Sequence, residues 1–159
     1  MLDKKIIELL YHDFLQINNM ISSNKIKHRM ITELFSQNPF CWRVEGITPN
    51  ALMAFKENGW IRDGIKINRS HLFNRIETHN EMLKRYMDIE EWWDFYWSRD
   101  FTILSLSSEN KNISSINFIK IESELGLFRT SGFAWRHGKA EREFLQHLWL
   151  QNSFSLELG

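Results

Sequence analysis

Hydrophobic residues recur at helical spacing over two stretches at the start of the chain. In the first stretch, Leu10, Phe14 and Ile17 lie three or four residues apart. This spacing places apolar side chains on one face of an α-helix that packs against a core. The pattern therefore predicts amphipathic helices over residues 3–21 and 25–36.

Three other stretches have the pattern of β-strands. Residues 40–46 and 65–69 alternate between apolar and polar side chains, and residues 101–106 form a mostly apolar run. Successive side chains of a strand point to opposite faces, so alternation is typical of a strand with one buried face. The segment 116–121 is rich in β-branched residues and fits either another strand or part of a helix that starts near residue 109.

Capping signals locate the remaining helices. Thr48-Pro49 is a strong helix start, because threonine caps the first turn and proline is tolerated there. Asp88 and Glu91 have the spacing of a capping box at the start of a tryptophan-rich helix over residues 88–98. Further helices are predicted from about Thr78 and over residues 139–151.

Helices around a few short strands indicate the α+β class. The 159 residues, 43% of them hydrophobic, fit one helix-rich domain around a small β-sheet. We expect a single domain over residues 1–159, with an N-terminal helical part at 1–38 and a C-terminal helix at 139–151.

Charge and cysteine content limit the classes of function. Twenty basic and twenty acidic residues give a net charge of zero, so only a local basic patch could bind nucleic acid. The single cysteine, Cys41, excludes an intrachain disulfide and a multi-cysteine zinc site. Without a secretory signal or an apolar membrane span, the sequence predicts a soluble cytoplasmic protein with no membrane partner.

The candidate chemistry centres on His71, which follows the predicted strand 65–69. Lys66, Arg69 and Arg75 lie close by in the sequence. Neighbouring cations should lower the pKa of a histidine, and a neutral imidazole can take a proton from the water that attacks a phosphodiester. The alternative is that these charges only solvate an edge strand and its neighbouring helices.

A second group of polar residues follows the strand 101–106. Glu109, Asn110 and Asn112 carry oxygen ligands for a divalent cation, which would stabilise charge on a scissile phosphate. Lys111 lies among them and could neutralise phosphate. These residues are the candidate metal site for Mg²⁺ or Mn²⁺.

A strand ending in histidine, an irregular insert, a second strand and then a helix bearing asparagine resemble the HNH (ββα-metal, His-Me finger) nucleases over residues 60–125. The resemblance implies a ββα-like core and a metal-dependent endonuclease that hydrolyses phosphodiesters, with DNA favoured over RNA. It implies His71 as the general base and Asn110 as the metal ligand, with Glu109 or Asn112 as substitutes. It also implies that Asn74 or Asn68 orients the histidine. Ser70 stands where the family usually has a metal ligand.

The glycine-bracketed segment 132–138 offers further contacts to nucleic acid. Trp135 could stack on a base, while Arg136 and Lys139 could hold phosphates. The alternative is that the aromatic residues of this segment fill the core.

A non-enzymatic binding module is the rival interpretation. It would bind nucleic acid or protein through the same basic face or through the tryptophan-rich helix 88–98, which could also pair two copies of the chain. The alternative for this helix is that its aromatic stripe belongs to the core.

Overall fold

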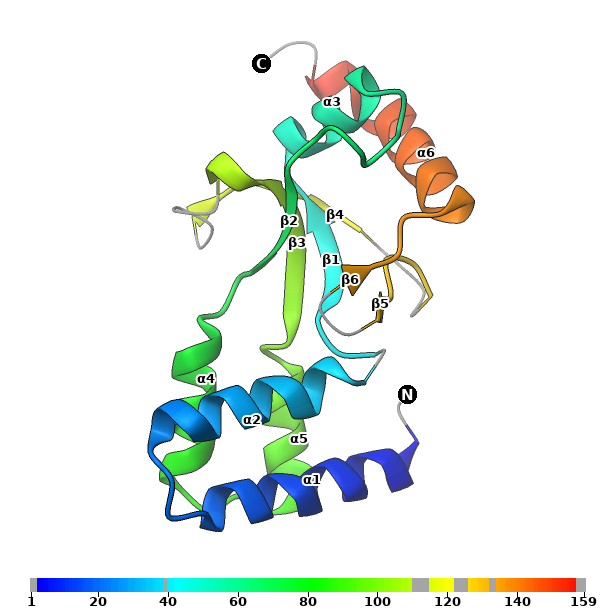
Figure 1. Cartoon of the computed structure of the whole chain (residues 1–159). Helices are drawn as coiled ribbons and strands as arrows, with labels where there is room; N and C mark the ends of the chain where they lie inside the picture. Colours follow the sequence, from blue (N-terminus) through cyan, green and yellow to red (C-terminus); the bar gives the residue numbers. More distant parts are fainter. Residues whose placement is uncertain (1–2, 39, 110–114, 122–125, 132–133, 157–159) are drawn as a thin grey trace.

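A group of helices forms one end of the molecule, and a small sheet with two further helices forms the other (Figure 1). The computed structural model describes residues 3–38, 40–109, 115–121, 126–131 and 134–156 of the chain. One end holds four helices: α1 (Lys4–Asn19), α2 (Asn24–Ser36), α4 (Arg75–Lys84) and α5 (Ile89–Trp97). At the other end, α3 (Pro49–Glu57) and α6 (Lys139–Leu156) lie beside the sheet. The predicted α+β single domain is confirmed.

The main sheet has the strand order β2-β3-β1-β4. Its members are β1 (Arg43–Ile47), β2 (Ile67–His71), β3 (Phe101–Leu106) and β4 (Ile119–Lys120). The central pair β1 and β3 is parallel, whereas β2 is antiparallel to β3 and β4 is antiparallel to β1. A separate hairpin pairs β5 (Thr130–Ser131) with β6 (Ala134–Trp135).

Each end of the molecule has its own hydrophobic core. Beside the sheet, Leu52 and Phe55 of α3 pack with Leu145 of α6. In the helical end, Trp92 is fully buried and its ring contacts those of Phe14 and Phe35. Burial of large apolar side chains at both ends supplies the main driving force for folding.

The tryptophan-rich helix α5 contributes its aromatic face to the core. Trp92 and Tyr96 are buried, and Trp93 and Trp97 are half-buried with their rings stacked at a centroid distance of 5.2 Å. The core interpretation of this stripe is therefore confirmed for Trp92 and Tyr96.

Among the described residues, side-chain caps fix the starts of α1, α3, α4 and α5, those of α3 and α5 at the predicted residues. The Thr48 hydroxyl accepts a hydrogen bond from the Ala51 N–H at 3.1 Å. The Asp88 carboxylate accepts one from the Glu91 N–H at 2.9 Å. Asn74 caps α4 in the same manner. Each cap satisfies a backbone donor that the first helical turn leaves unpaired.

The structure corrects several predicted boundaries. The strand predicted at 65–69 is β2, which runs two residues further along the chain to His71. Of the two alternatives for residues 116–121, the strand is confirmed at Ile119–Lys120, because β4 pairs with β1. Residues 107–109 form a short 3₁₀ turn, and residues 110–114 of the helix predicted from about residue 109 lie outside the described part of the chain. The backbone groups of this segment form their hydrogen bonds with the sheet instead of within a helix. One of these bonds runs from the Ile121 N–H to the Glu45 carbonyl at 2.9 Å. The last helix extends to Leu156 instead of ending at 151.

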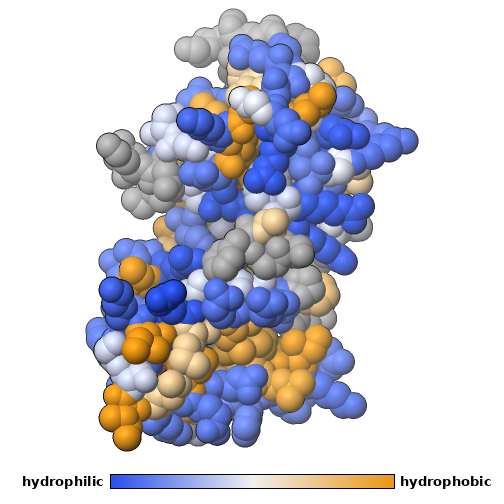
Figure 2. Space-filling view, viewed as in Figure 1, coloured by the Kyte–Doolittle hydropathy of each residue, from blue (hydrophilic) through white to orange (hydrophobic). Residues whose placement is uncertain are grey.

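Apolar side chains are exposed mainly over the helical end. Figure 2 shows hydrophobic surface over α1 and α2, whereas the sheet end is largely hydrophilic in that view. Leu9, Ile26 and Met30 are the large exposed apolar residues of these two helices. Among the described residues, no helix has the length and apolar character needed to span a bilayer.

Candidate phosphate-binding site

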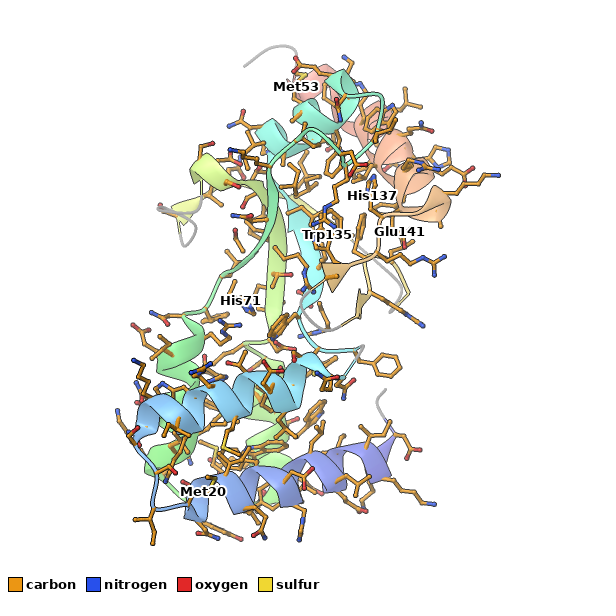
Figure 3. The ribbon with its side chains drawn as sticks, viewed as in Figure 1. Met20, Met53, His71, Trp135, His137 and Glu141 are labelled. Carbon is orange, nitrogen blue, oxygen red and sulfur yellow. The ribbon has the colours of Figure 1, made fainter. Side chains whose placement is uncertain are left out.

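His71 lies where the sheet meets the helical end of the molecule (Figure 3). It is the last residue of β2, and Arg69 precedes it by two positions. Residues two apart in a strand point to the same face, so both side chains leave the sheet together. Ser70 between them is buried and its hydroxyl lies 2.7 Å from that of Ser105. Ser70 is therefore a core residue and faces away from His71.

Arg75 reaches the same place from the first turn of α4. The Asn74 side chain accepts hydrogen bonds from the Ile76 N–H at 3.0 Å and the Glu77 N–H at 3.4 Å. Its amide nitrogen donates to the Glu77 carboxylate at 3.4 Å. Asn74 thus fixes the start of α4 and the position of Arg75, which corrects its predicted role in orienting His71.

Asn68 is the other candidate for orienting His71, and its amide oxygen is bonded to Ser107. The Ser107 hydroxyl donates to that oxygen at 3.3 Å, which ties β2 to the segment after β3. Asn68 therefore serves the pairing of the strands.

Trp42 joins these groups into one cluster and was not singled out from the sequence. Its ring lies edge-on to His71, with centroids 5.5 Å apart, and the guanidinium groups of Arg69 and Arg75 each lie 5.3 Å from its centre. The backbone of Trp42 has a positive φ of 57°, which is a strained conformation for a bulky residue. Such strain persists only where the surroundings hold the residue firmly.

Asp100, the residue directly before β3, holds Trp42 in this conformation. Its carboxylate accepts a hydrogen bond of 2.7 Å from the Trp42 N–H. Burial raises the pKa of Asp100 to about 6, although this hydrogen bond and the nearby Arg43 and Arg69 act to lower it. The only sequence signal for Asp100 is a charged residue directly before an apolar strand.

The cluster combines a neutral imidazole with two cations. Burial lowers the pKa of His71 to about 3, and Arg75 and Arg69 lower it further. The predicted direction is confirmed, but burial rather than like charge is the larger cause. Burial also lowers the pKa of Arg69 to about 10, while Asp100 acts to raise it, so Arg69 stays charged at neutral pH.

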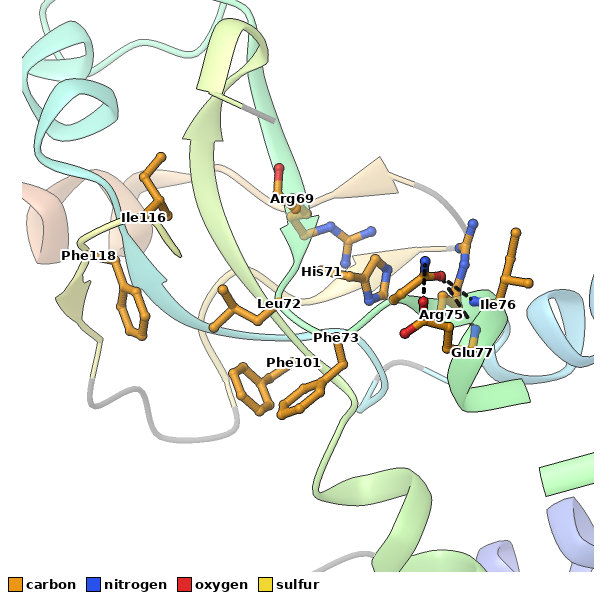
Figure 4. A pocket seen from close by; sticks show the side chains of 12 residues that line it. Arg69, His71, Leu72, Phe73, Arg75, Ile76, Glu77, Phe101, Ile116 and Phe118 are labelled. Carbon is orange, nitrogen blue, oxygen red and sulfur yellow. Dashed lines mark hydrogen bonds between the residues drawn. The ribbon is translucent and has the colours of Figure 1, made fainter. Parts of the chain in front are cut away.

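Two grooves meet at this cluster. The larger has a volume of about 1010 Å³ and contains Phe73 and Phe101 as well as His71 (Figure 4). The smaller, of about 320 Å³, extends from His71 to Trp135. Both grooves are lined by Arg69, His71 and Arg75, and the buried Ser70, whose hydroxyl is bonded to Ser105, also borders both.

The smaller groove contains a third arginine. The Arg62 guanidinium stacks over the Trp135 ring at 4.1 Å from its centroid and donates to the Trp135 carbonyl at 3.3 Å. The structure thus brings Trp135 to the site, although the ring itself is buried. Arg62 lies outside the predicted set because its position depends on this tertiary contact.

Three other predicted phosphate ligands lie outside both grooves. Lys66 is at the opposite end of β2 from His71, where its carbonyl accepts a bond of 2.9 Å from the Ser107 N–H. Arg136 pairs with Glu141 at 3.7 Å, and Lys139 pairs with Glu143 at the same distance. In the described segment 134–138, Trp135 and His137 pack inward, and His137 stacks on Phe55 of α3.

Glu109 is also far from His71, which corrects its prediction as a metal ligand of the same site. The antiparallel register pairs His71 with Thr102, whereas Glu109 follows Leu106 at the other end of β3. At about 3.3 Å per residue, Thr102 and Leu106 are already ~13 Å apart. The Glu109 carboxylate accepts hydrogen bonds from the Thr48 hydroxyl, the Asn50 amide and the Leu106 N–H. It therefore fastens α3 to the end of β3.

The remaining predicted residues, Asn110, Lys111 and Asn112, lie outside the described part of the chain. Within that part, no three histidine, cysteine or acidic side chains are grouped so as to hold a metal ion. The metal site that the nuclease resemblance implies therefore stays a prediction.

Comparisons with known proteins identified no relative of this chain. No family model, curated protein or solved structure matches the chain. The site has to be interpreted from its own geometry.

Proposed function

We propose that this protein binds the phosphodiester backbone of nucleic acid at Arg69, His71 and Arg75. The observation that carries the proposal is a pair of guanidinium groups beside a neutral imidazole, each 5.3 Å from the centre of the Trp42 ring, at the meeting point of two grooves. Guanidinium groups match phosphate oxygens in both charge and geometry.

The aromatic neighbours of the cluster support the same ligand. Trp42 and Trp135 each have an arginine over the ring, and both line the groove of about 320 Å³. Alternating arginines and aromatic rings are the elements from which sites for nucleic-acid strands are built. Because the whole chain has a net charge of zero, we expect modest affinity that depends on this local cluster.

We expect Arg75→Gln to weaken binding of a short oligodeoxythymidylate about 10-fold, because one charge-assisted contact to phosphate is lost. The slope of log K against log salt should become less steep by about 0.7. Lys66→Gln is the matched control, because Lys66 is a cation of the same strand region that lies at the far end of β2. Fluorescence anisotropy over a salt series measures both quantities. Equal losses in the two variants would contradict a localised site.

Hydrolysis at this site, as the resemblance to HNH nucleases implies, is the second candidate function. It is favoured by the neutral state of His71, whose pKa burial lowers to about 3. An imidazole with so low a pKa is a weak base, but a bound phosphate next to it would raise that pKa by its negative charge. His71 would then accept the proton of the attacking water, while Arg69 and Arg75 stabilise charge on the phosphate.

Plasmid nicking in the presence of Mg²⁺ or Mn²⁺ tests this second candidate. We expect His71→Gln, which preserves the size and polarity of the side chain, to lower the nicking rate about 100-fold while oligonucleotide binding persists. Urea unfolding of both proteins checks that the variant is folded. Nicking at equal rates by wild type and variant would remove His71 from the chemistry.

A further inference from the structure

The larger groove beside His71 has two walls of different chemistry. Figure 4 shows the rings of Phe73 and Phe101 together on one side of His71, with Phe118 further away beyond Leu72 and with Arg69 and Arg75 on the other side. Phe73 is 43% exposed, which is unusual for a phenylalanine in a region with so many buried rings. A ligand that fills this groove must present an apolar face to one wall and negative charge to the other.

The exposed ring of Phe73 is held in place by its neighbours. It meets Phe101 edge-on at a centroid distance of 5.5 Å, and the Arg99 guanidinium lies 5.8 Å from its centre. A ring braced in this way loses little conformational freedom when a flat ligand stacks on it. Phe73 is therefore a ready-made stacking platform two residues from His71.

We infer that the strand bound by this protein is single-stranded, with an unpaired base stacked on Phe73 and the adjoining phosphate between Arg69 and Arg75. The inference rests on the proposed function and names its substrate class. A base in a duplex has both faces covered by its neighbours, so only an unpaired base can occupy the aromatic wall.

The larger groove also contains one acidic residue, Glu77, which affects where a phosphate can bind. Glu77 lies on the wall of α4, where its carboxylate accepts the hydrogen bond from Asn74. A second phosphate next to Glu77 would be repelled, whereas the amino or imino group of a base can donate to a carboxylate. Because Glu77 and Arg75 both lie in the first turn of α4, this carboxylate limits the arginine side to one phosphate.

Phe73→Ala tests the inference when three ligands of equal length are compared by fluorescence anisotropy. These are an oligodeoxythymidylate, a strand of abasic sugars and a duplex. We expect the substitution to weaken thymidylate binding about 10-fold and to leave the abasic strand unchanged, because only the base contacts the ring. Phe73→Trp should restore binding. Tyr86→Ala is the matched control, since Tyr86 is an aromatic residue that is 81% exposed and lies outside the groove.

The outcomes separate this inference from the proposed function. If Arg75→Gln weakens both single strands while Phe73→Ala weakens neither, the phosphate site stands and base stacking is overturned. Tighter binding of the duplex than of the thymidylate strand would overturn the single-strand inference in the same way. If none of the three ligands binds, both proposals fail.

Discussion

Asp100→Ala is expected to lower the free energy of unfolding by about 3 kcal/mol, because it removes one partner from a buried charged cluster. Asp100 is only 4% exposed, and its carboxylate is the acceptor for the Trp42 N–H at 2.7 Å. Without that acceptor, the strained backbone of Trp42 loses the group that holds it. The nearby Arg69 also loses the charge that raises its pKa against burial. Urea unfolding at neutral pH measures the change.

Asp100→Asn separates the hydrogen bond from the charge. An asparagine keeps an oxygen that can accept from the Trp42 N–H, so we expect a smaller loss of stability than in the alanine variant. Both variants should bind oligonucleotides less tightly if the carboxylate also serves to balance Arg69. Wild-type stability in Asp100→Ala would show that the carboxylate does not hold Trp42.

A loss of stability in mild acid is the second large expected effect, and it arises from the buried His79 and the partly buried His71. Burial lowers the pKa of both His71 and His79 to about 3, and Arg75 lowers both further. The ring of His79 in α4 also lies 5.9 Å from that of His28 in α2, and its Nδ1 has no hydrogen-bond partner among the described residues. Below about pH 6.5 the unfolded chain therefore takes up protons that the folded chain excludes.

The sign of the pH dependence follows from these shifts. Each lowered histidine pKa removes about 1.4 kcal/mol of stability per unit as the pH falls below about 6.5. Asp100 acts in the opposite direction, because its pKa is raised to about 6 and the folded chain binds its proton more tightly. Between about pH 6 and about pH 4, two histidines against one aspartate leave a net loss of ~1.4 kcal/mol per unit.

His79→Leu tests this origin of the acid sensitivity. The substitution removes one buried titratable group of similar size, so we expect the stability curve to flatten by about 1.4 kcal/mol per pH unit over that interval. His12→Leu is the matched control, because the His12 side chain is 71% exposed. Urea unfolding at several pH values gives the slopes. A slope unchanged by His79→Leu would show that His79 is charged in the folded protein at these pH values.

Local patterns were sufficient to predict most of the secondary structure. Some signals depend only on residues that are neighbours in the sequence, and these were predicted at the right positions. They are the helix caps at Thr48 and Asp88 and the apolar run of β3. The sequence left strand and helix both open at β4, and this ambiguity has a physical cause. The two residues of β4 form a strand because they pair with β1, and this pairing cannot be predicted from the neighbouring sequence.

The candidate site was predicted only in part. The position of Glu109 relative to His71 depends on the direction of β3, which the sequence does not give. Arg69, His71 and Arg75 lie within seven residues of each other and form one cluster. Glu109 was expected opposite His71, but β3 runs antiparallel to β2 and carries Glu109 past the start of β2. Trp42 could not be found from the sequence, since neither its positive φ nor its contact with His71 is encoded locally.

Backbone and side-chain chemical shifts during titration with a short oligodeoxythymidylate provide the most direct test of the proposed phosphate site. We expect the largest changes at Arg69, His71 and Arg75 and at the indole N–H of Trp42, with Phe73 affected by the stacked base. Shifts concentrated on the exposed apolar surface of α1 and α2 would instead indicate a protein-interaction module. Such a pattern, or no shifts at all, would contradict the proposal that this cluster binds nucleic-acid phosphates.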